Sequence, residues 1–261
     1  MDLAEQNREA WNAASKGECD WSIPVSADEI KLARKGDWSV RLTPKKMMPH
    51  EWFPPLKGLE ILCLASGGGQ QVPLLAAAGA KVTSLDISDE QLSKDVIVAK
   101  QYDLPVITIR GEMTDLSRFE TGSFDLIFNP ASTLFIEDVE PVWEACYRVL
   151  RPGGILLSGS MNPSFFLFDH DEGLRQGTLN VKFPLPYSDL TSLTDAQEAA
   201  MRKTRKTIEF GHSLEALIGG QIRSGFQITG FYEDYWDDSV TLLNLYSPTS
   251  FATRAQKSSH G

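Results

Sequence analysis

Cysteine is scarce in this sequence, and long apolar runs are missing. The three cysteines are Cys19, Cys63 and Cys146; they form no Cys-x-x-Cys pair, and no cysteine–histidine cluster has zinc-site spacing. No apolar stretch reaches the length of a membrane span, and the N-terminus MDLAEQNREAW lacks the apolar centre of a signal peptide. We therefore expect a cytoplasmic protein with no metal site and no membrane partner.

Positive charge is also in short supply. Lysine and arginine total 25 against 35 aspartates and glutamates, which gives a formal net charge of -10. Such a field repels phosphate backbones, so nucleic acid is not an expected partner. The dense basic run at 202–206 (RKTRK) is interpreted as a solvated helix face rather than a binding patch. The length of 261 residues fits one large soluble domain with an insertion, as a monomer or a homodimer.

The middle of the chain alternates between short apolar runs and amphipathic segments. Predicted strands are Leu59–Leu64, Lys81–Leu85, Pro105–Arg110, Phe124–Phe128 and Ile155–Ser158, and predicted helices are Val72–Ala80, the segment from the N-cap Ser88 to Gln101, and Val139–Leu150. The sequence Arg151-Pro152-Gly153-Gly154 should end the last helix before the fifth strand. This order predicts parallel β-α-β units, whose ligands bind at the carboxyl ends of the strands.

The alternation stops after the fifth strand. Residues 161–210 are rich in aromatics and prolines, and residues 1–54 are irregular and rich in tryptophan. Regularity returns in residues 211–261, with a helix over Ser213–Ser224 and strands over Phe226–Glu233 and near Phe251–Gln256. We therefore divide the chain into an N-terminal lid (1–54), a core (55–160), a lid insertion (161–210) and the remainder of the core (211–261).

A glycine-rich loop follows the first strand. The sequence Ser66-Gly67-Gly68-Gly69 must turn sharply into a helix, and its backbone N–H groups can bind an anionic group. Asp86 ends the next strand, where a carboxylate can accept both hydroxyls of a ribose. Together the two features indicate a nucleoside-containing cofactor. Val72 occupies the place of the third glycine in the dinucleotide fingerprint, which disfavours a nicotinamide oxidoreductase.

With these motifs the sequence resembles the class I S-adenosylmethionine (SAM)-dependent methyltransferases, in particular those that act on small molecules. The resemblance runs from Leu59 to Ser158 and resumes at Ser213. It rests on the glycine loop 63–69, the segment DISDEQL at 86–92, GEMTDL at 111–116, SFDLI at 123–127 and RVLRPGG at 148–154. It implies an α/β, doubly wound, mostly parallel seven-stranded sheet with an antiparallel last strand, beneath a lid formed by the N-terminal segment and the insertion.

The resemblance also implies a cofactor site for SAM, with S-adenosylhomocysteine (SAH) as product. The implied cofactor residues are Ala65, Ser66, Gly67, Gly69, Gln70, Asp86, Ile87, Gln91, Glu112, Met113 and Asn129. Asp86 would hold the ribose and Glu112 the adenine amine. Two positions depart from the family pattern: Cys63 replaces an acid that helps organise the loop, and Ala65 replaces a glycine. Alanine fits at 65 if its backbone keeps a negative φ.

Catalytic groups for the methyl acceptor are expected in the lid and at strand ends. His212, Tyr187 and Asn162 are the candidates, although His212 also fits a helix cap and Tyr187 equally fits plain packing. The run Phe165–Phe168 fits either a pocket wall or the lid's own core. The segment Asp169–Asp171 is interpreted as a solvated loop rather than a metal site. Trp11 and Trp38 are candidates to cover the cofactor.

The sequence thus leaves two main hypotheses. The first is a SAM-dependent methyltransferase that acts on a small, partly apolar acceptor enclosed by the lid. The alternative, motivated by Cys63, is a SAM- or nucleoside-binding sensor without catalysis. The acceptor, and whether oxygen, nitrogen, sulfur or carbon is methylated, stay open.

Overall fold

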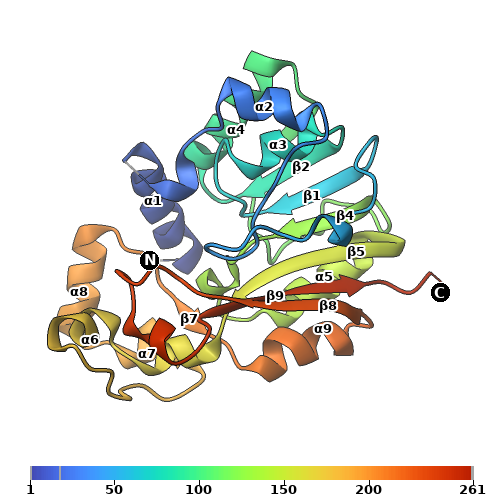
Figure 1. Cartoon of the computed structure of the whole chain (residues 1–261). Coiled ribbons are helices and arrows are strands. Elements are labelled where there is room, and N and C mark those ends of the chain that lie inside the picture. The colour runs from blue at the N-terminus through green and yellow to red at the C-terminus, as the bar shows by residue number, and fades with distance from the viewer. Residues whose placement is uncertain (1, 18, 260–261) are drawn as a thin grey trace.

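The computed structural model describes residues 2–17 and 19–259, and its centre is a large sheet with helices on both faces (Figure 1). Within these residues the sheet has seven strands in the order β3-β2-β1-β4-β5-β9-β8. Its strands are β1 (Glu60–Leu64), β2 (Lys81–Asp86), β3 (Val106–Arg110), β4 (Phe124–Asn129), β5 (Leu150–Met161), β8 (Gln227–Asp234) and β9 (Ser250–Gln256). The strands β1 to β5 pair in parallel, and the last strand, β9, is antiparallel to both neighbours. The predicted fold class is confirmed.

Helices connect and cover these strands. The α-helices are α1 (Leu3–Lys16), α2 (Ala27–Ala33), α3 (Gln71–Ala77), α4 (Asp89–Tyr102), α5 (Glu140–Val149), α6 (His170–Gln176), α7 (Asp189–Ser192), α8 (Asp195–Thr204) and α9 (Gly220–Arg223). Shorter 3-10 turns are η1 (Asp20–Ser22), η2 (His50–Trp52), η3 (Thr133–Phe135), η4 (Pro163–Leu167) and η6 (Leu242–Leu245), and η5 (Glu215–Gly219) is a π-helical turn. Met1, Glu18, His260 and Gly261, which belong to the predicted first and last segments, lie outside the described residues.

The alternation of side chains along β1 creates the two cores. Ile61 and Cys63 face the cluster that contains residues of α2, α3 and α4, whereas Leu62 and Leu64 face the cluster built on α5. All four side chains are fully buried, because β1 lies inside the sheet and helices cover both faces. The order β3-β2-β1-β4 reverses direction between β1 and β4, and this is the place where such sheets bind ligands.

Two predicted elements differ from the observed ones. The fifth strand begins at Leu150 rather than Ile155, because Leu150 pairs with Phe124 before a register shift that places Ile155 opposite Leu126. The predicted helix from Ser213 becomes the π-helical turn η5 followed by α9. A Cβ at Gly220 would lie 2.7 Å from the Trp143 ring, so a glycine is required for this close packing, at the cost of helix propensity.

The two irregular segments have structure that the sequence did not predict. The insertion forms η4, the short helices α6 to α8, and one strand of a two-stranded sheet, β6 (Tyr187–Ser188), which pairs with β7 (Phe210–Gly211). The N-terminal segment has two parts. Its first helix, α1, packs against α4, whereas Ile30 and Leu42, each 1% exposed, belong to the core of the sheet.

Candidate active site

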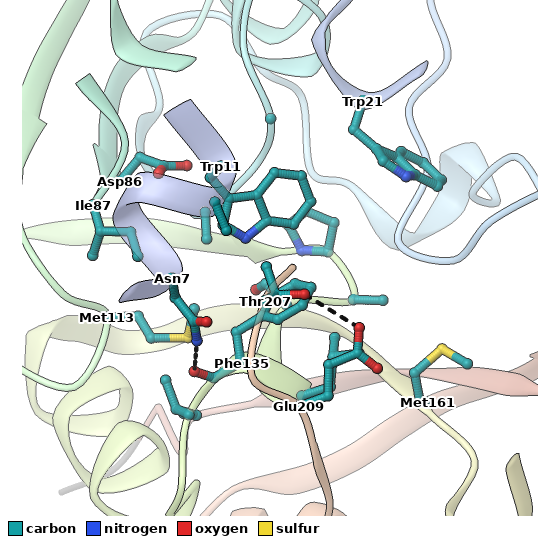
Figure 2. Close-up of a pocket in the computed structure, with 18 of the residues that line it drawn as sticks. Asn7, Trp11, Trp21, Asp86, Ile87, Met113, Phe135, Met161, Thr207 and Glu209 are labelled. Atoms are coloured by element: carbon teal, nitrogen blue, oxygen red, sulfur yellow. Dashed lines mark hydrogen bonds between the residues drawn. The ribbon is translucent and has the colours of Figure 1, made fainter. Parts of the chain in front are cut away.

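A cavity of about 1060 Å³ lies at the carboxyl ends of the parallel strands (Figure 2). Residues from the ends of successive strands line it, including Ser66 after β1, Asp86 on β2 and Met161 on β5. The N-terminal segment contributes Trp11 and Trp21 to the lining. The sheet, the N-terminal segment and the insertion therefore all contribute residues to one cavity.

The glycine loop is held in a conformation that few residues adopt. Gly67 and Gly69 have φ values of 74° and 75°, and Ala65 has a φ of 45°. The condition under which alanine would fit at position 65, a negative φ, is therefore not met; the N–H of Ala65 donates to the carbonyl of Leu85, which fixes the backbone there. A Cβ at Gly67 would lie 2.5 Å from the carbonyl oxygen of Trp21, so the N-terminal segment packs directly on the loop.

One buried hydroxyl in this loop has no oxygen or nitrogen partner within the described residues. Ser66 lines the cavity, is 4% exposed, and its side chain meets the thiol of Cys63, a weak partner. Buried polar atoms almost always have a partner. The orphaned Oγ therefore fits a site whose ligand brings a polar group to the loop.

Asp86 provides the carboxylate of the site. It is 8% exposed, and burial raises its pKa to about 7, although N–H groups of Ser88 and Ile87 oppose this rise. Its Oδ1 accepts from the backbone N–H of Ser88 at 2.8 Å. Ser88 caps α4 as predicted, since its Oγ accepts from the N–H of Gln91. A charged Asp86 thus lacks enough donors, and the hydroxyls of a ribose would supply them.

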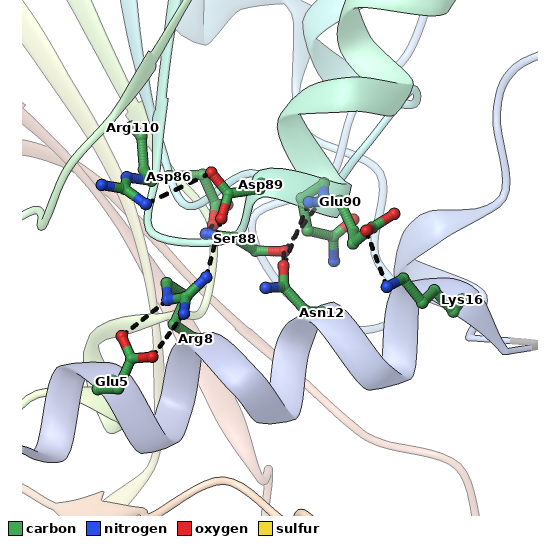
Figure 3. Close-up of polar contacts among 10 residues, drawn as sticks. Glu5, Arg8, Asn12, Lys16, Asp86, Ser88, Asp89, Glu90 and Arg110 are labelled. Carbon is green, nitrogen blue, oxygen red and sulfur yellow. Dashed lines mark hydrogen bonds and ion pairs between the residues drawn. The ribbon is translucent and has the colours of Figure 1, made fainter. Parts of the chain in front are cut away.

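The N-terminal helix is joined to the start of α4 beside Asp86 (Figure 3). Arg8 pairs with Asp89 at 2.9 Å, and Lys16 pairs with Glu90 at 3.0 Å. Between them, Asn12 Oδ1 accepts from the hydroxyl of Ser88 at 2.8 Å. The two ion pairs are exposed and individually weak, so the contact is a set of small contributions that orders α1 beside Asp86.

Comparisons with known proteins agree with this geometry. The methyltransferase domain family matches residues 62–158. An uncharacterized methyltransferase of Bacillus subtilis (strain 168), YbaJ, is 47% identical over 255 residues, which is 98% of each chain. The chain belongs to this methyltransferase family.

More distant relatives support the same conclusion. The ubiquinone biosynthesis O-methyltransferase of Rhizobium etli (strain CIAT 652) is 31% identical over 109 residues, 41% of this chain and 43% of that relative. The crystal structure of a SAM-dependent methyltransferase from Mesorhizobium loti has a TM-score of 0.61 at 19% identity, over 79% of this chain and 94% of that one. The likeness to the Mesorhizobium loti structure concerns the fold alone. With the family match and the full-length relative, the protein is a SAM-dependent methyltransferase and SAM is its cofactor.

The methyltransferase cavity brings most of the predicted cofactor residues together. Those that line it are Ala65, Ser66, Gly67, Asp86, Ile87, Gln91, Glu112 and Met113. Gly69, Gln70 and Asn129 are not among the lining residues. Gln70 donates to the carbonyl of Asp20, and the fully buried Asn129 lies within hydrogen-bond distance of Ser132 and Ser158. The side chains of Gln70 and Asn129 therefore form hydrogen bonds within the protein and do not face the cavity.

The three predicted catalytic residues do not line the cavity. His212 lies within hydrogen-bond distance (3.0 Å) of the carbonyl of Thr133, and burial lowers the pKa of this histidine. The Tyr187 hydroxyl donates to Asp189 at 2.7 Å, and burial together with this carboxylate raises the pKa of the tyrosine. The Asn162 side chain caps η4. Each side chain is thus engaged with the protein's own groups.

The cavity instead contains a carboxylate that the sequence did not indicate. Glu209 lines it near Met161, and its nearest hydrogen-bond partner is the hydroxyl of Thr207 at 3.4 Å (Figure 2). Burial and the neighbouring Asp189 raise the pKa of Glu209 to about 7. Glu209 stands in no recognisable motif, and the only available signal was an acid directly before the apolar Phe210.

Other predicted lid residues have mixed positions. Trp38 packs on Phe53 and His50 in the N-terminal segment and does not line the cavity, whereas Trp11 and Trp21 do. The side chain of Asp169 caps α6, and the described residues contain no cluster of metal ligands.

The aromatic run and the basic run also reach the cavity. Phe165 forms part of its wall, and Phe166 packs in a small apolar cluster with Leu134 and Met161. The helix α8 ends before Arg205 and Lys206, and both line the cavity rather than a helix face. Within the described residues, no helix is long and apolar enough to cross a membrane.

Proposed function

We propose that this methyltransferase acts on a small, partly apolar molecule bound in the cavity beside SAM. The observation that supports it is the placement of lining residues at two ends of one cavity. Asp86 and Met113 lie on one side, which we assign to the cofactor, and Met161 lies on the other (Figure 2). Phe165 and Trp236, which belong to the apolar cluster of Met161, also line the cavity. The volume of about 1060 Å³ is at the upper limit for sites that enclose one drug-sized ligand, so cofactor and acceptor would fill it together.

The division assigns roles to residues of this chain. SAM supplies an activated methyl group on a sulfonium, and the protein must align an acceptor, exclude water and remove a proton where needed. Asp86 would accept the ribose hydroxyls and Ser66 a polar group of the methionine part. The N-terminal segment and the insertion would act as the lid. Glu209 is our candidate to accept a proton from a protic acceptor, since its pKa is about 7 and its carboxylate has few donors.

His212, Tyr187 and Asn162 stay predictions as catalytic residues. The geometry of the cavity does not support a catalytic role for them, because their side chains already form hydrogen bonds within the protein. A rearrangement of the lid would be needed to bring them to an acceptor.

Two measurements test the proposal in sequence. Calorimetric titration with SAM and SAH comes first, and the absence of binding at high micromolar concentration would refute the cofactor site. The second follows SAH release with panels of phenols, carboxylic acids, amines and thiols. Turnover should favour compounds with an apolar body and one protic group. SAM binding without turnover on any panel would favour the sensor alternative.

A further inference from the structure

Asp95 is a fully buried carboxylate in the middle of α4, outside the cavity and outside every sequence motif. It is 0% exposed and lies on the helix face that also buries Leu92 and Val98. An unpaired carboxylate at such a position would cost several kcal/mol, so its partners must be strong. Within the described residues, the structure pairs it with two donors, one in the cofactor loop and one on the neighbouring strand β2.

The first donor is the loop itself. The backbone N–H of Gly69 donates to Asp95 Oδ1 at 2.7 Å. Gly69 has a φ of 75°, and its carbonyl accepts from the N–H of Val25 in the N-terminal segment at 2.8 Å. The loop peptide is thus held from both sides, and only the Asp95 side provides a charge. A charge-assisted hydrogen bond of this length is roughly twice as strong as a neutral one.

The second donor places Asp95 beside residue 63. Ser84 Oγ donates to Asp95 Oδ2 at 2.8 Å, and Ser84 on β2 is the register partner of Cys63 on β1. Side chains of register partners on parallel strands lie on the same face of the sheet. Asp95 therefore approaches the sheet on the face to which Cys63 points.

Cys63 cannot provide the charge itself. It is 0% exposed, and both burial and the nearby Asp95 raise the pKa of its thiol, so it stays neutral. A carboxylate at position 63 would instead share a buried space with Asp95. Two like charges so close cannot both be ionised without a large penalty.

Neighbouring residues of α4 complete the support of the loop. A Cβ at Gly68 would lie 2.5 Å from Gln91 Oε1, so the loop rests directly on this helix. Lys94 Nζ donates to the carbonyls of Ser15 and Ser22, each at 2.6 Å, which attaches the N-terminal segment to the same helix. The helix α4 thus contacts both the cofactor loop and the N-terminal segment that packs on this loop.

We propose that Asp95 is the positioning carboxylate of the SAM loop, and that it provides from α4 the carboxylate that residue 63 lacks. It acts through the Gly69 N–H and not by contact with the cofactor. The inference concerns SAM binding alone, so it does not depend on the acceptor proposed above.

The test is calorimetric titration of SAH into the wild type, Asp95→Asn, Cys63→Asp and the double variant Cys63→Asp/Asp95→Asn. We expect each single variant to bind SAH at least about tenfold more weakly, the first through loss of charge and the second through repulsion. The double variant restores one carboxylate at the same place, and its affinity should return to within about threefold of wild type. A purely structural role of Asp95 would not produce this rescue.

Asp103→Asn is the matched control, because it removes the same charge from the exposed end of the same helix. Its SAH affinity should stay within about twofold of wild type. The proposal is overturned if the Asp95→Asn variant binds SAH as tightly as the wild type. It is also overturned if the double variant binds SAH no more tightly than the Asp95→Asn variant. If Asp95→Asn does not fold, amide exchange on the wild type decides: a Gly69 N–H without protection also overturns it.

Discussion

Asn7 on α1 forms hydrogen bonds in both directions with Ile208, which follows it by 201 residues in the chain. Its Oδ1 accepts from the Ile208 N–H at 2.7 Å, and its Nδ2 lies within 3.2 Å of the Ile208 carbonyl. The same Nδ2 also donates to the carbonyl of Phe135 at 3.0 Å (Figure 2). One buried amide therefore ties the N-terminal helix, the loop after β4 and the end of the insertion around the cavity.

The contact predicts a large effect for Asn7→Leu. This change keeps the approximate volume but leaves two carbonyls and one N–H buried without their partner, so we expect a loss of about 2–4 kcal/mol in the free energy of unfolding. The helix α1 and the end of the insertion should also separate more often. Urea denaturation gives the first quantity, and hydrogen exchange over residues 3–16 and 206–212 gives the second.

The adjacent residue offers a control for this prediction. Gln6 is 8% exposed on the same helix, and its Nε2 has no partner within the described residues. Gln6→Met should therefore be neutral or stabilising, because a buried unpaired donor is removed. Equal losses for Asn7→Leu and Gln6→Met would contradict the role of the Asn7 hydrogen bonds.

The backbone of Ala65 predicts that Ala65→Gly is tolerated or stabilising. A left-handed conformation costs an L-residue roughly 1–2 kcal/mol, whereas an added glycine raises the entropy of the unfolded chain by about 0.4–1 kcal/mol. We expect a net gain of up to about 1.6 kcal/mol and unchanged SAH affinity. Ala78→Gly, at a φ of -74°, should instead destabilise the protein by about 0.5–1 kcal/mol. Chemical denaturation measures the free energy of unfolding of both variants. If Ala65→Gly destabilised the protein as much as Ala78→Gly, the backbone of Ala65 would not be strained.

The core of the fold was predictable because its signals are local. Each parallel strand is a short apolar run bounded by glycine, proline or polar residues, and Ser88 announces the start of α4. The insertion lacked such signals, since its short elements depend on distant partners. Tyr187 pairs with Gly211 across 23 intervening residues, and no local pattern specifies that contact.

The site was predictable where a motif fixes the position of a residue on the sheet. Asp86 ends β2 and Met113 comes soon after β3, so sequence order alone places them at the cavity. Glu209 and Asp95 come from elements whose placement depends on tertiary packing. For Asp95 a weak signal existed, because an acid interrupts the apolar stripe of Leu92 and Val98. Nothing in that stripe indicates that its partner is the N–H of Gly69.

The raised pKa of Asp86 predicts that SAH binding weakens in acid. The folded pKa of about 7 lies above the reference of 3.8, so the unliganded protein loses stability as the pH rises through this window. Ribose hydroxyls donate to the charged form, and SAH should therefore bind roughly tenfold more weakly at about pH 6 than at about pH 8. Calorimetry at both values measures it. Asp86→Asn should bind weakly and lose part of this pH dependence, the remainder coming from Asp95, whose pKa is also raised to about 7 by burial.

Glu209→Gln tests whether this carboxylate belongs to the acceptor end. The folded pKa of about 7 exceeds the reference of 4.5, so the wild type loses stability as the pH rises between these values, and the amide removes that loss. The stability of the variant relative to wild type should therefore increase by about 1–3 kcal/mol across the window, as measured by denaturation at several pH values. Glu144→Gln, on the exposed face of α5, should follow the wild-type curve. SAH affinity should change less than about twofold, because Asp86 and the glycine loop hold the cofactor. If the stabilities of the wild type and the Glu209→Gln variant changed in parallel with pH, and the variant bound SAH more weakly, Glu209 would belong to the cofactor end instead.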